Sequence, residues 1–237
     1  MPTDTLMRHS ISTSTKNNAA RLAHNSIQGH YHSEYGVMYS ADSSLLRWSM
    51  TVGCFLDPTS HAAKYASSLV LRRPILGCGM LIGGKESFLV ISDMHIPYHH
   101  KDTFDFLLAL DAEYNFDNIL CVGDMVDNHR GSYHESEPGS YDEETEYTMA
   151  QEALQELQEL FPKMVIVTGN HDEIPVRKLK TCGLPSSMLS DYNSIYGLNK
   201  GWTWLPEYRF NSKGAKPVLQ PMQMGRNHRW DGQIVCL

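Results

Sequence analysis

Residue types that bind divalent metal ions recur at short spacings in the second half of this 237-residue sequence. Asp93 and His95 flank one residue, Asp124 follows a glycine, and residues 169–172 read Gly-Asn-His-Asp. Carboxylate, imidazole and amide groups together suit ions such as Mn²⁺, Zn²⁺ or Fe²⁺. Each pattern alone has an ordinary structural explanation. Asp-x-His is common by chance, Gly-Asp usually forms a turn, and Gly-Asn-His-Asp could cap a helix. Their combination predicts a metal site.

The segments that precede these residues have the composition of buried strands. Residues 88–92, 118–122 and 164–168 are short apolar runs, and each ends where one of the polar groups begins. Between them, residues 102–114 and 149–161 carry apolar side chains at helical spacing. In a parallel sheet the carboxyl ends of the strands lie along one edge, where ligands bind. We therefore predict a βαβαβ unit that gathers the polar groups at one edge.

The first half of the chain gives weaker patterns. Strands are expected at residues 26–28, 35–39 and 45–55, with a turn at 40–44 and a short helix at 13–24. The Gly-rich residues 77–85 are expected to join the two halves, either as a flexible link or as a strand end with a turn. The tail from residue 211 is rich in Gly, Pro and polar residues, and no strand is predicted there.

Composition narrows the classes of protein and of partner. A net charge of -7 does not favour a protein that binds nucleic acid through nonspecific phosphate contacts. The five cysteines are odd in number and show no Cys-x-x-Cys spacing, which is typical of reduced residues in an intracellular protein. The first 15 residues are polar, and no apolar stretch approaches the roughly 20 residues of a membrane span. We expect a cytoplasmic protein with no membrane association, whose oligomeric state the sequence does not set.

Three motifs in the second half resemble the calcineurin-like metallophosphoesterase family. They are Asp93-x-His95, Gly123-Asp124-x-x-Asp127 and Gly169-Asn170-His171-Asp172, and their spacing is similar to the family's. The resemblance covers residues 86–175. In this family a further histidine and a Gly-His-x-His motif normally follow downstream, but the downstream tail offers only His228. Half of the expected site is therefore missing from this part of the chain.

The missing half is found upstream. Gly29-His30-Tyr31-His32 resembles the Gly-His-x-His motif, and Arg8-His9-Ser10 resembles the remaining histidine motif, which usually reads His-Gly. The alternative is a set of surface histidines near a turn. The resemblance implies a circularly permuted α/β protein, a four-layer α/β/β/α sandwich in one domain over residues 1–237. Residues 1–82 would correspond to the family's C-terminal half and residues 86–237 to its N-terminal half, with Gly83 and Gly84 near the old termini.

The resemblance also implies a role for each residue. One metal would be held by Asp93, His95 and His32, the other by Asn170, His9 and His30, and Asp124 would bridge both. His171 would be the general acid, hydrogen-bonded by Asp127, and a hydroxide bridging the metals would be the nucleophile. Mn²⁺ is the expected metal, with Zn²⁺, Fe²⁺ and Ni²⁺ as alternatives. Asp172 is expected to support the loop.

The resulting hypothesis is a dinuclear hydrolase that cleaves phosphodiesters or phosphomonoesters of small or nucleotide-like substrates. Alternatives are a DNA or RNA nuclease on the same core and a non-catalytic metal-binding protein. Asn128 and Asp172 stand where protein phosphatases of this family usually have Arg and Glu, which disfavours that branch. The acidic residues 135–146 form either a solvated loop leading into a helix or a lid. His129 or Arg130 are candidates for phosphate contact and His99, His100 and His134 for the site mouth, while His24 and His61 are expected on the surface.

Overall fold

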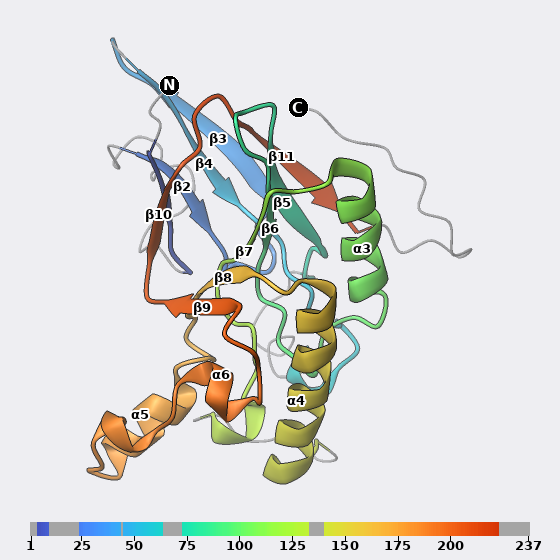
Figure 1. The fold of residues 1–237 in the computed structure, drawn as a ribbon, viewed down its shortest axis with the longest axis vertical. Helices are drawn as coiled ribbons and strands as arrows, with labels where there is room; N and C mark the ends of the chain where they lie inside the picture. Colours follow the sequence, from blue (N-terminus) through green and yellow to red (C-terminus); the bar gives the residue numbers. More distant parts are fainter. Residues whose placement is uncertain (1–3, 10–23, 44, 64–72, 133–139, 223–237) are drawn as a thin grey trace.

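The computed structural model describes residues 4–9, 24–43, 45–63, 73–132 and 140–222, which form two mixed β-sheets with helices (Figure 1). The strands are β1 (Asp4–Met7), β2 (Asn25–Gln28), β3 (Gly36–Ala41), β4 (Leu46–Thr51), β5 (Gly77–Ile82), β6 (Phe88–Ile91), β7 (Asn118–Cys121), β8 (Met164–Val167), β9 (Trp202–Leu205), β10 (Tyr208–Asn211) and β11 (Lys216–Pro221). The helices are α3 (Thr103–Tyr114), α4 (Glu143–Leu160), α5 (Ile174–Thr181) and α6 (Tyr192–Ile195), with 3₁₀ turns η1 (His129–Gly131) and η2 (Ser186–Met188).

Each sheet has a parallel centre and antiparallel neighbours. The five-stranded sheet has the order β10-β1-β2-β4-β3, in which β1, β2 and β4 run parallel. The six-stranded sheet has the order β11-β5-β6-β7-β8-β9, in which β6 to β9 run parallel. The predicted α/β class is therefore confirmed, as are the strands at β6, β7 and β8 and the helices α3 and α4.

The six-stranded sheet is apolar on both faces because successive side chains of a strand point to opposite sides. Phe88 and Val90 of β6 pack in one core with residues of the five-stranded sheet such as Trp48. Leu89 and Ile91 of the same strand pack in a second core that includes α3 and α4. The two sheets thus share one core, and these helices cover the other face of the six-stranded sheet. The fourth layer of the expected sandwich stays a prediction.

The Gly-rich segment is the buried strand β5 followed by a turn, so the second of its two expected forms is confirmed and the flexible link is excluded. Two other expectations need correction or fall outside the described residues. The tail, where no strand was predicted, contains β11, which pairs with β5. The helix expected at residues 13–24 lies almost wholly outside the described residues. Among the helices that the structure describes, none is long and apolar enough to cross a membrane.

Candidate metal centre

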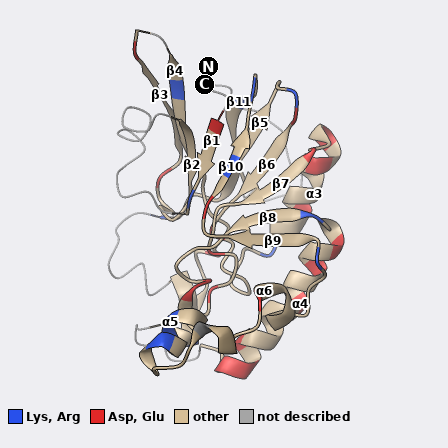
Figure 2. Cartoon of the chain, turned by 60° about the vertical axis from the view of Figure 1, so that its left-hand side comes forward, with Lys and Arg blue, Asp and Glu red and all other residues tan. Residues whose placement is uncertain are grey.

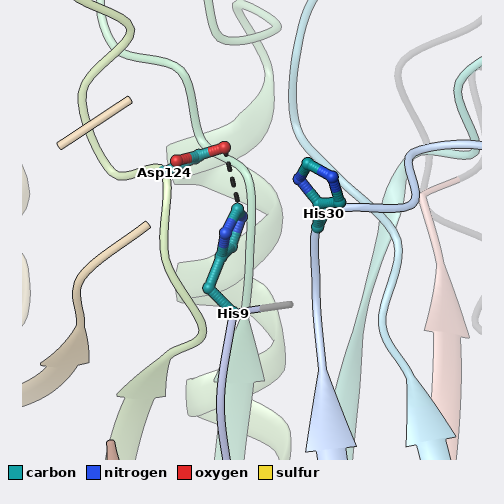
Figure 3. A group of neighbouring side chains, drawn as sticks. All are labelled: His9, His30 and Asp124. Carbon is teal, nitrogen blue, oxygen red and sulfur yellow. Dashed lines mark ion pairs between the residues drawn. The ribbon is translucent and has the colours of Figure 1, made fainter. Parts of the chain in front are cut away.

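The predicted site residues follow the ends of parallel strands in both sheets. Asp93, Asp124 and Asn170 come two or three residues after β6, β7 and β8. His9 and His30 come two residues after β1 and β2, which run parallel in the facing sheet. In Figure 3 these two histidines rise side by side from their strands, close to Asp124. Because the two sheets pack against each other, both groups meet at one edge of the molecule.

The backbone at these residues has a conformation that L-amino acids rarely adopt. His30 has φ 70°, Asp93 and His95 have φ 49°, and Asp124 has φ 48°. Such left-handed residues cost about 1–3 kcal/mol each and gather at functional sites, where the surrounding structure holds them in place. Four of the seven predicted metal ligands share this feature. Local backbone strain is therefore tolerated at the residues whose side chains point toward the site.

Two glycines let the N-terminal and C-terminal motifs approach each other. A Cβ on Gly29 would lie 1.9 Å from Ser92 Oγ and 2.6 Å from Asp93 Oδ2. A Cβ on Gly123, whose φ is +90°, would lie 2.3 Å from His9 Cδ2. No larger residue fits at either position without displacement. The Gly-His-x-His motif is therefore shaped to the carboxylate of Asp93, and the Gly-Asp motif to the ring of His9.

One cluster consists of His32, Asp93 and His95, whose donor atoms lie within 4.8 Å of one another. His32 Nε2 is 3.2 Å from Asp93 Oδ1 and 3.1 Å from His95 Nε2. His95 Nδ1 donates to Asp127 Oδ1 at 2.5 Å, which leaves the lone pair of Nε2 facing the cluster. A ring whose outer nitrogen donates to a carboxylate while its inner nitrogen faces other donors is the usual arrangement of a histidine metal ligand.

A second cluster consists of His9, His30 and Asp124 (Figure 3). His9 Nε2 lies 3.1 Å from Asp124 Oδ2 and 3.2 Å from Asp93 Oδ1. The same Asp124 oxygen lies 4.0 Å from His95 Nε2, so it faces histidines of both clusters. Its other oxygen accepts a hydrogen bond from the backbone N–H of His171 at 2.8 Å. Asp124 thus has the position that a bridging carboxylate needs, and the assignment of that role stays a prediction.

The electrostatics of both clusters favour a bound cation. Burial alone would raise the pKa of Asp93 and Asp124, but their histidine neighbours outweigh it and hold both pKa values below the usual range. Burial would lower the pKa of His9, yet Asp124 and Asp93 raise it well above its ordinary value. The same carboxylates raise the pKa of His32 against the effect of its burial, whereas burial keeps the pKa of His30 below its ordinary value. The buried carboxylates thus draw protons onto His9 and His32. Divalent ions would supply the same positive charge, so the donor set fits the metals that the sequence predicts.

His171 and Asp127 are close together, but their contact differs from the predicted one. His171 Nδ1 donates to the backbone carbonyl of Asp127 at 2.6 Å, while the Asp127 carboxylate is 3.4 Å away and binds His95 instead. The hydrogen bond predicted with the Asp127 carboxylate is therefore made with the carbonyl of the same residue, and the carboxylate contacts His171 only as an ion-pair neighbour. Burial lowers the pKa of His171, and Asp124 and Asp127 outweigh it, so the pKa lies above its ordinary value. The protonated form is favoured, as predicted.

The Gly-Asn-His-Asp loop is held from two sides. Asp172 is buried, and its carboxylate accepts the backbone N–H groups of Val126 at 3.0 Å and Gly169 at 2.8 Å, which is the supporting contact that was expected. Arg177 donates to the backbone carbonyl of Asn170. The Asn170 side chain makes no hydrogen bond with another described residue, so its role as a ligand stays a prediction.

Other sequence-predicted residues have mixed outcomes. His129 is buried, with Nδ1 3.6 Å from Asp127 Oδ2, so its ring is not exposed to an incoming phosphate. Arg130 Nε donates to the Tyr141 carbonyl. His99 stacks on Phe104 of α3, and His100 is buried. His24 and His61 are partly exposed, and His134 lies outside the described residues. Glu146, which sequence reasoning placed in a solvated loop, a lid or the start of a helix, is buried in the first turn of α4.

Comparison with known proteins gives one match. A model of the calcineurin-like phosphoesterase family matches residues 87–229, which is more than half of the chain. No curated protein and no solved structure matches it. The matched segment begins one residue before β6 and contains Asp93, His95, Asp124 and His171, whereas His9, His30 and His32 lie outside it.

Proposed function

Because the chain belongs to the calcineurin-like phosphoesterase family, we propose that it is a phosphate-ester hydrolase with a dinuclear metal centre and a permuted motif order. One observation carries this proposal. Three histidines from outside the family match lie beside the carboxylates within it, in two clusters that share Asp124 and Asp93 as neighbours. Surface histidines near a turn would not converge in this way. The N-terminal motifs supply the donors that the matched segment lacks.

The permutation is supported by the connection between the two halves. The family match begins at residue 87 and includes none of residues 1–86. β5 and β6 are antiparallel neighbours joined by a turn at residues 83–87, so only this short connection separates the N-terminal part from the first metal motif. Opening the chain at such a surface turn and joining the ends elsewhere preserves the sheets.

The residues have distinct roles in the proposed reaction. Asp93, His95 and His32 would hold one ion, His9, His30 and Asn170 the other, and Asp124 would contact both. Two such ions, for which Mn²⁺ is the first candidate, supply an acidified water as the nucleophile and neutralise charge on the phosphate. His171 is oriented by the Asp127 carbonyl and kept in its protonated form by the nearby carboxylates, so it can give a proton to the departing oxygen.

Charges near the site support a small or nucleotide-like substrate. Lys and Arg on α5 and Asp and Glu on α4 lie at the same end of the molecule (Figure 2). A groove of about 210 Å³ between these helices is lined by Arg130 and Lys178 but also by Glu143 and Glu146. A long polyanion requires a continuous basic surface, and these carboxylates interrupt it. We therefore favour a small or nucleotide-like substrate over a nucleic acid.

The test combines metal content with hydrolysis. Protein loaded with Mn²⁺ is assayed with bis(p-nitrophenyl) phosphate, p-nitrophenyl phosphate and an oligonucleotide, and its metal is counted by elemental analysis. Wild type is compared with His30→Ala, Asp124→Asn and His171→Ala, and with His24→Ala as a matched histidine control. We expect two ions per chain, hydrolysis that His30→Ala and Asp124→Asn lose, and full activity in the control. His171→Ala is expected to keep its two ions and to lose less activity with these two esters, because p-nitrophenolate needs little protonation to leave. Full activity and metal content in His30→Ala would refute the permuted site, and preference for the oligonucleotide would favour the nuclease.

A further inference from the structure

Glu146 makes contacts that its neighbours on the same helix turn do not. It is 4% exposed, whereas Glu143 and Glu144 are exposed. Its carboxylate accepts two backbone N–H groups of η1, from His129 at 2.6 Å and from Arg130 at 3.1 Å. N–H groups in the first turn of a helix have no partner within that helix. Glu146, which belongs to α4, therefore caps the first N–H groups of η1. Burial of its carboxylate is tolerated because each of its two oxygens accepts a hydrogen bond.

The turn that Glu146 holds begins directly after the residues that orient both catalytic-site histidines. The carboxylate of Asp127 accepts a hydrogen bond from His95 Nδ1, and its backbone carbonyl accepts one from His171 Nδ1. Asn128, in the left-handed conformation with φ 50°, donates from Nδ2 to the carbonyl of His171 at 3.1 Å. Three contacts to these histidines thus come from two residues whose backbone leads straight into η1.

His129 provides a second link between Glu146 and Asp127. The ring of His129 is buried, and its Nδ1 lies 3.6 Å from Asp127 Oδ2, the oxygen that does not bind His95. The backbone N–H of this same residue is the closer of the two that Glu146 accepts. Displacing the backbone of His129 therefore moves the ring that packs behind the Asp127 carboxylate.

We propose that Glu146 is a positioning residue that holds residues 127–130 so that the Asp127 carbonyl orients His171. This inference rests on the proposed function and adds a residue from outside all of the metal motifs. Glu146 is not adjacent to the metal clusters and acts through Asp127. A purely structural role, in which Glu146 only docks α4 on η1, is the alternative that the test must separate.

The test uses the dependence of rate on the leaving group. Glu146→Gln keeps one acceptor oxygen but turns an NH₂ group toward the other backbone N–H, and Glu144→Gln is the exposed control on the same turn. The substrates are phenyl and p-nitrophenyl esters of whichever class the Mn²⁺-loaded wild type cleaves. Phenolate leaves poorly and needs the proton from His171, whereas p-nitrophenolate needs it little. General acid catalysis contributes about 10²–10⁴-fold, so we expect kcat for the phenyl ester to fall about 30-fold or more in Glu146→Gln.

For the p-nitrophenyl ester, the expected loss is below about fivefold. The double variant Glu146→Gln/His171→Ala is expected to be no slower than His171→Ala, since both changes remove one contribution. An equal fractional loss with both esters, or an additive double variant, would overturn the positioning role and leave the hydrolase intact. Wild-type activity in Asp124→Asn would instead overturn the proposed function. If Glu146→Gln does not fold, Glu146→Asp, which keeps the charge but is too short to reach both N–H groups, is judged by the same criteria.

Discussion

The two regions that build the metal centre differ in how they present their donors. Residues 88–175 present carboxylates at the ends of the parallel strands β6 and β7, and backbone N–H groups hold them: His30 N–H binds Asp93 and His171 N–H binds Asp124. Residues 4–51 present imidazoles that lie against these carboxylates: His9 Nε2 and His32 Nε2 are each 3.2 Å from Asp93 Oδ1. The first region matches the family and the second does not. The carboxylates are held by backbone N–H groups, and the histidines supply the other donors of the proposed metal site.

Each region is nevertheless shaped by the other. The N–H that holds Asp93 belongs to His30, and the glycines that allow the approach, Gly29 and Gly123, belong one to each region. The site is therefore a joint product of two segments far apart in the sequence.

The largest effect is expected for Asp124→Asn, because this carboxylate faces histidines of both regions. An amide loses the negative charge and half of the acceptor capacity, so both ions are expected to bind weakly. Metal ions contribute several kcal/mol to transition-state stabilisation, and about 1.4 kcal/mol corresponds to a factor of ten. We expect kcat/KM to fall by about 1,000-fold and the elemental metal count to fall from two. A variant that keeps two ions and wild-type activity would contradict the bridging position.

His9→Ala should have a smaller effect, confined to one of the two ions. His9 Nε2 faces Asp124, but the cluster of His32, Asp93 and His95 does not include it. We expect one ion per chain to remain and kcat/KM to fall about 100-fold, because one metal loses a ligand while the other keeps all of its own. Titration with Mn²⁺ followed by calorimetry measures both sites separately. Loss of both ions would show instead that the two regions bind metal only as a unit.

Gly29→Ala tests whether the close approach of the regions matters by itself. The new Cβ would lie 1.9 Å from Ser92 Oγ, so the Gly-His-x-His segment must move away from Asp93. Overpacking of this kind costs about 1–3 kcal/mol, and the displacement should also weaken metal binding. Gly36→Ala is the matched control, because no atom lies within 4 Å of the position that its Cβ would take. Urea unfolding of both variants measures the difference, and equal stabilities would contradict the steric role of Gly29.

The sequence predicted the parts of this structure that depend on local pattern. Strands β6, β7 and β8 were found because buried parallel strands are continuous apolar runs. β11 was missed because Pro217 and Pro221 are typical of loops, and the edge of a sheet is the one place in a strand where proline is tolerated. The acceptor of the His171 ring was predicted wrongly because a sequence does not distinguish the carboxylate of Asp127 from its carbonyl. The burial of Glu146 depends on backbone N–H groups 16 and 17 residues away, which no residue pattern records.

The smallest effect is expected for Arg8→Ala, which separates the charge of the N-terminal region from its metal ligands. Arg8 directly precedes His9, but its side chain is 51% exposed and pairs with Glu207. Exposed ion pairs contribute little because water and salt screen them. We expect the metal count to be unchanged and kcat/KM to stay within about twofold of wild type. A loss as large as that of His9→Ala would contradict this expectation. It would mean that the N-terminal region contributes to the reaction through its surface charge as well as through its imidazoles.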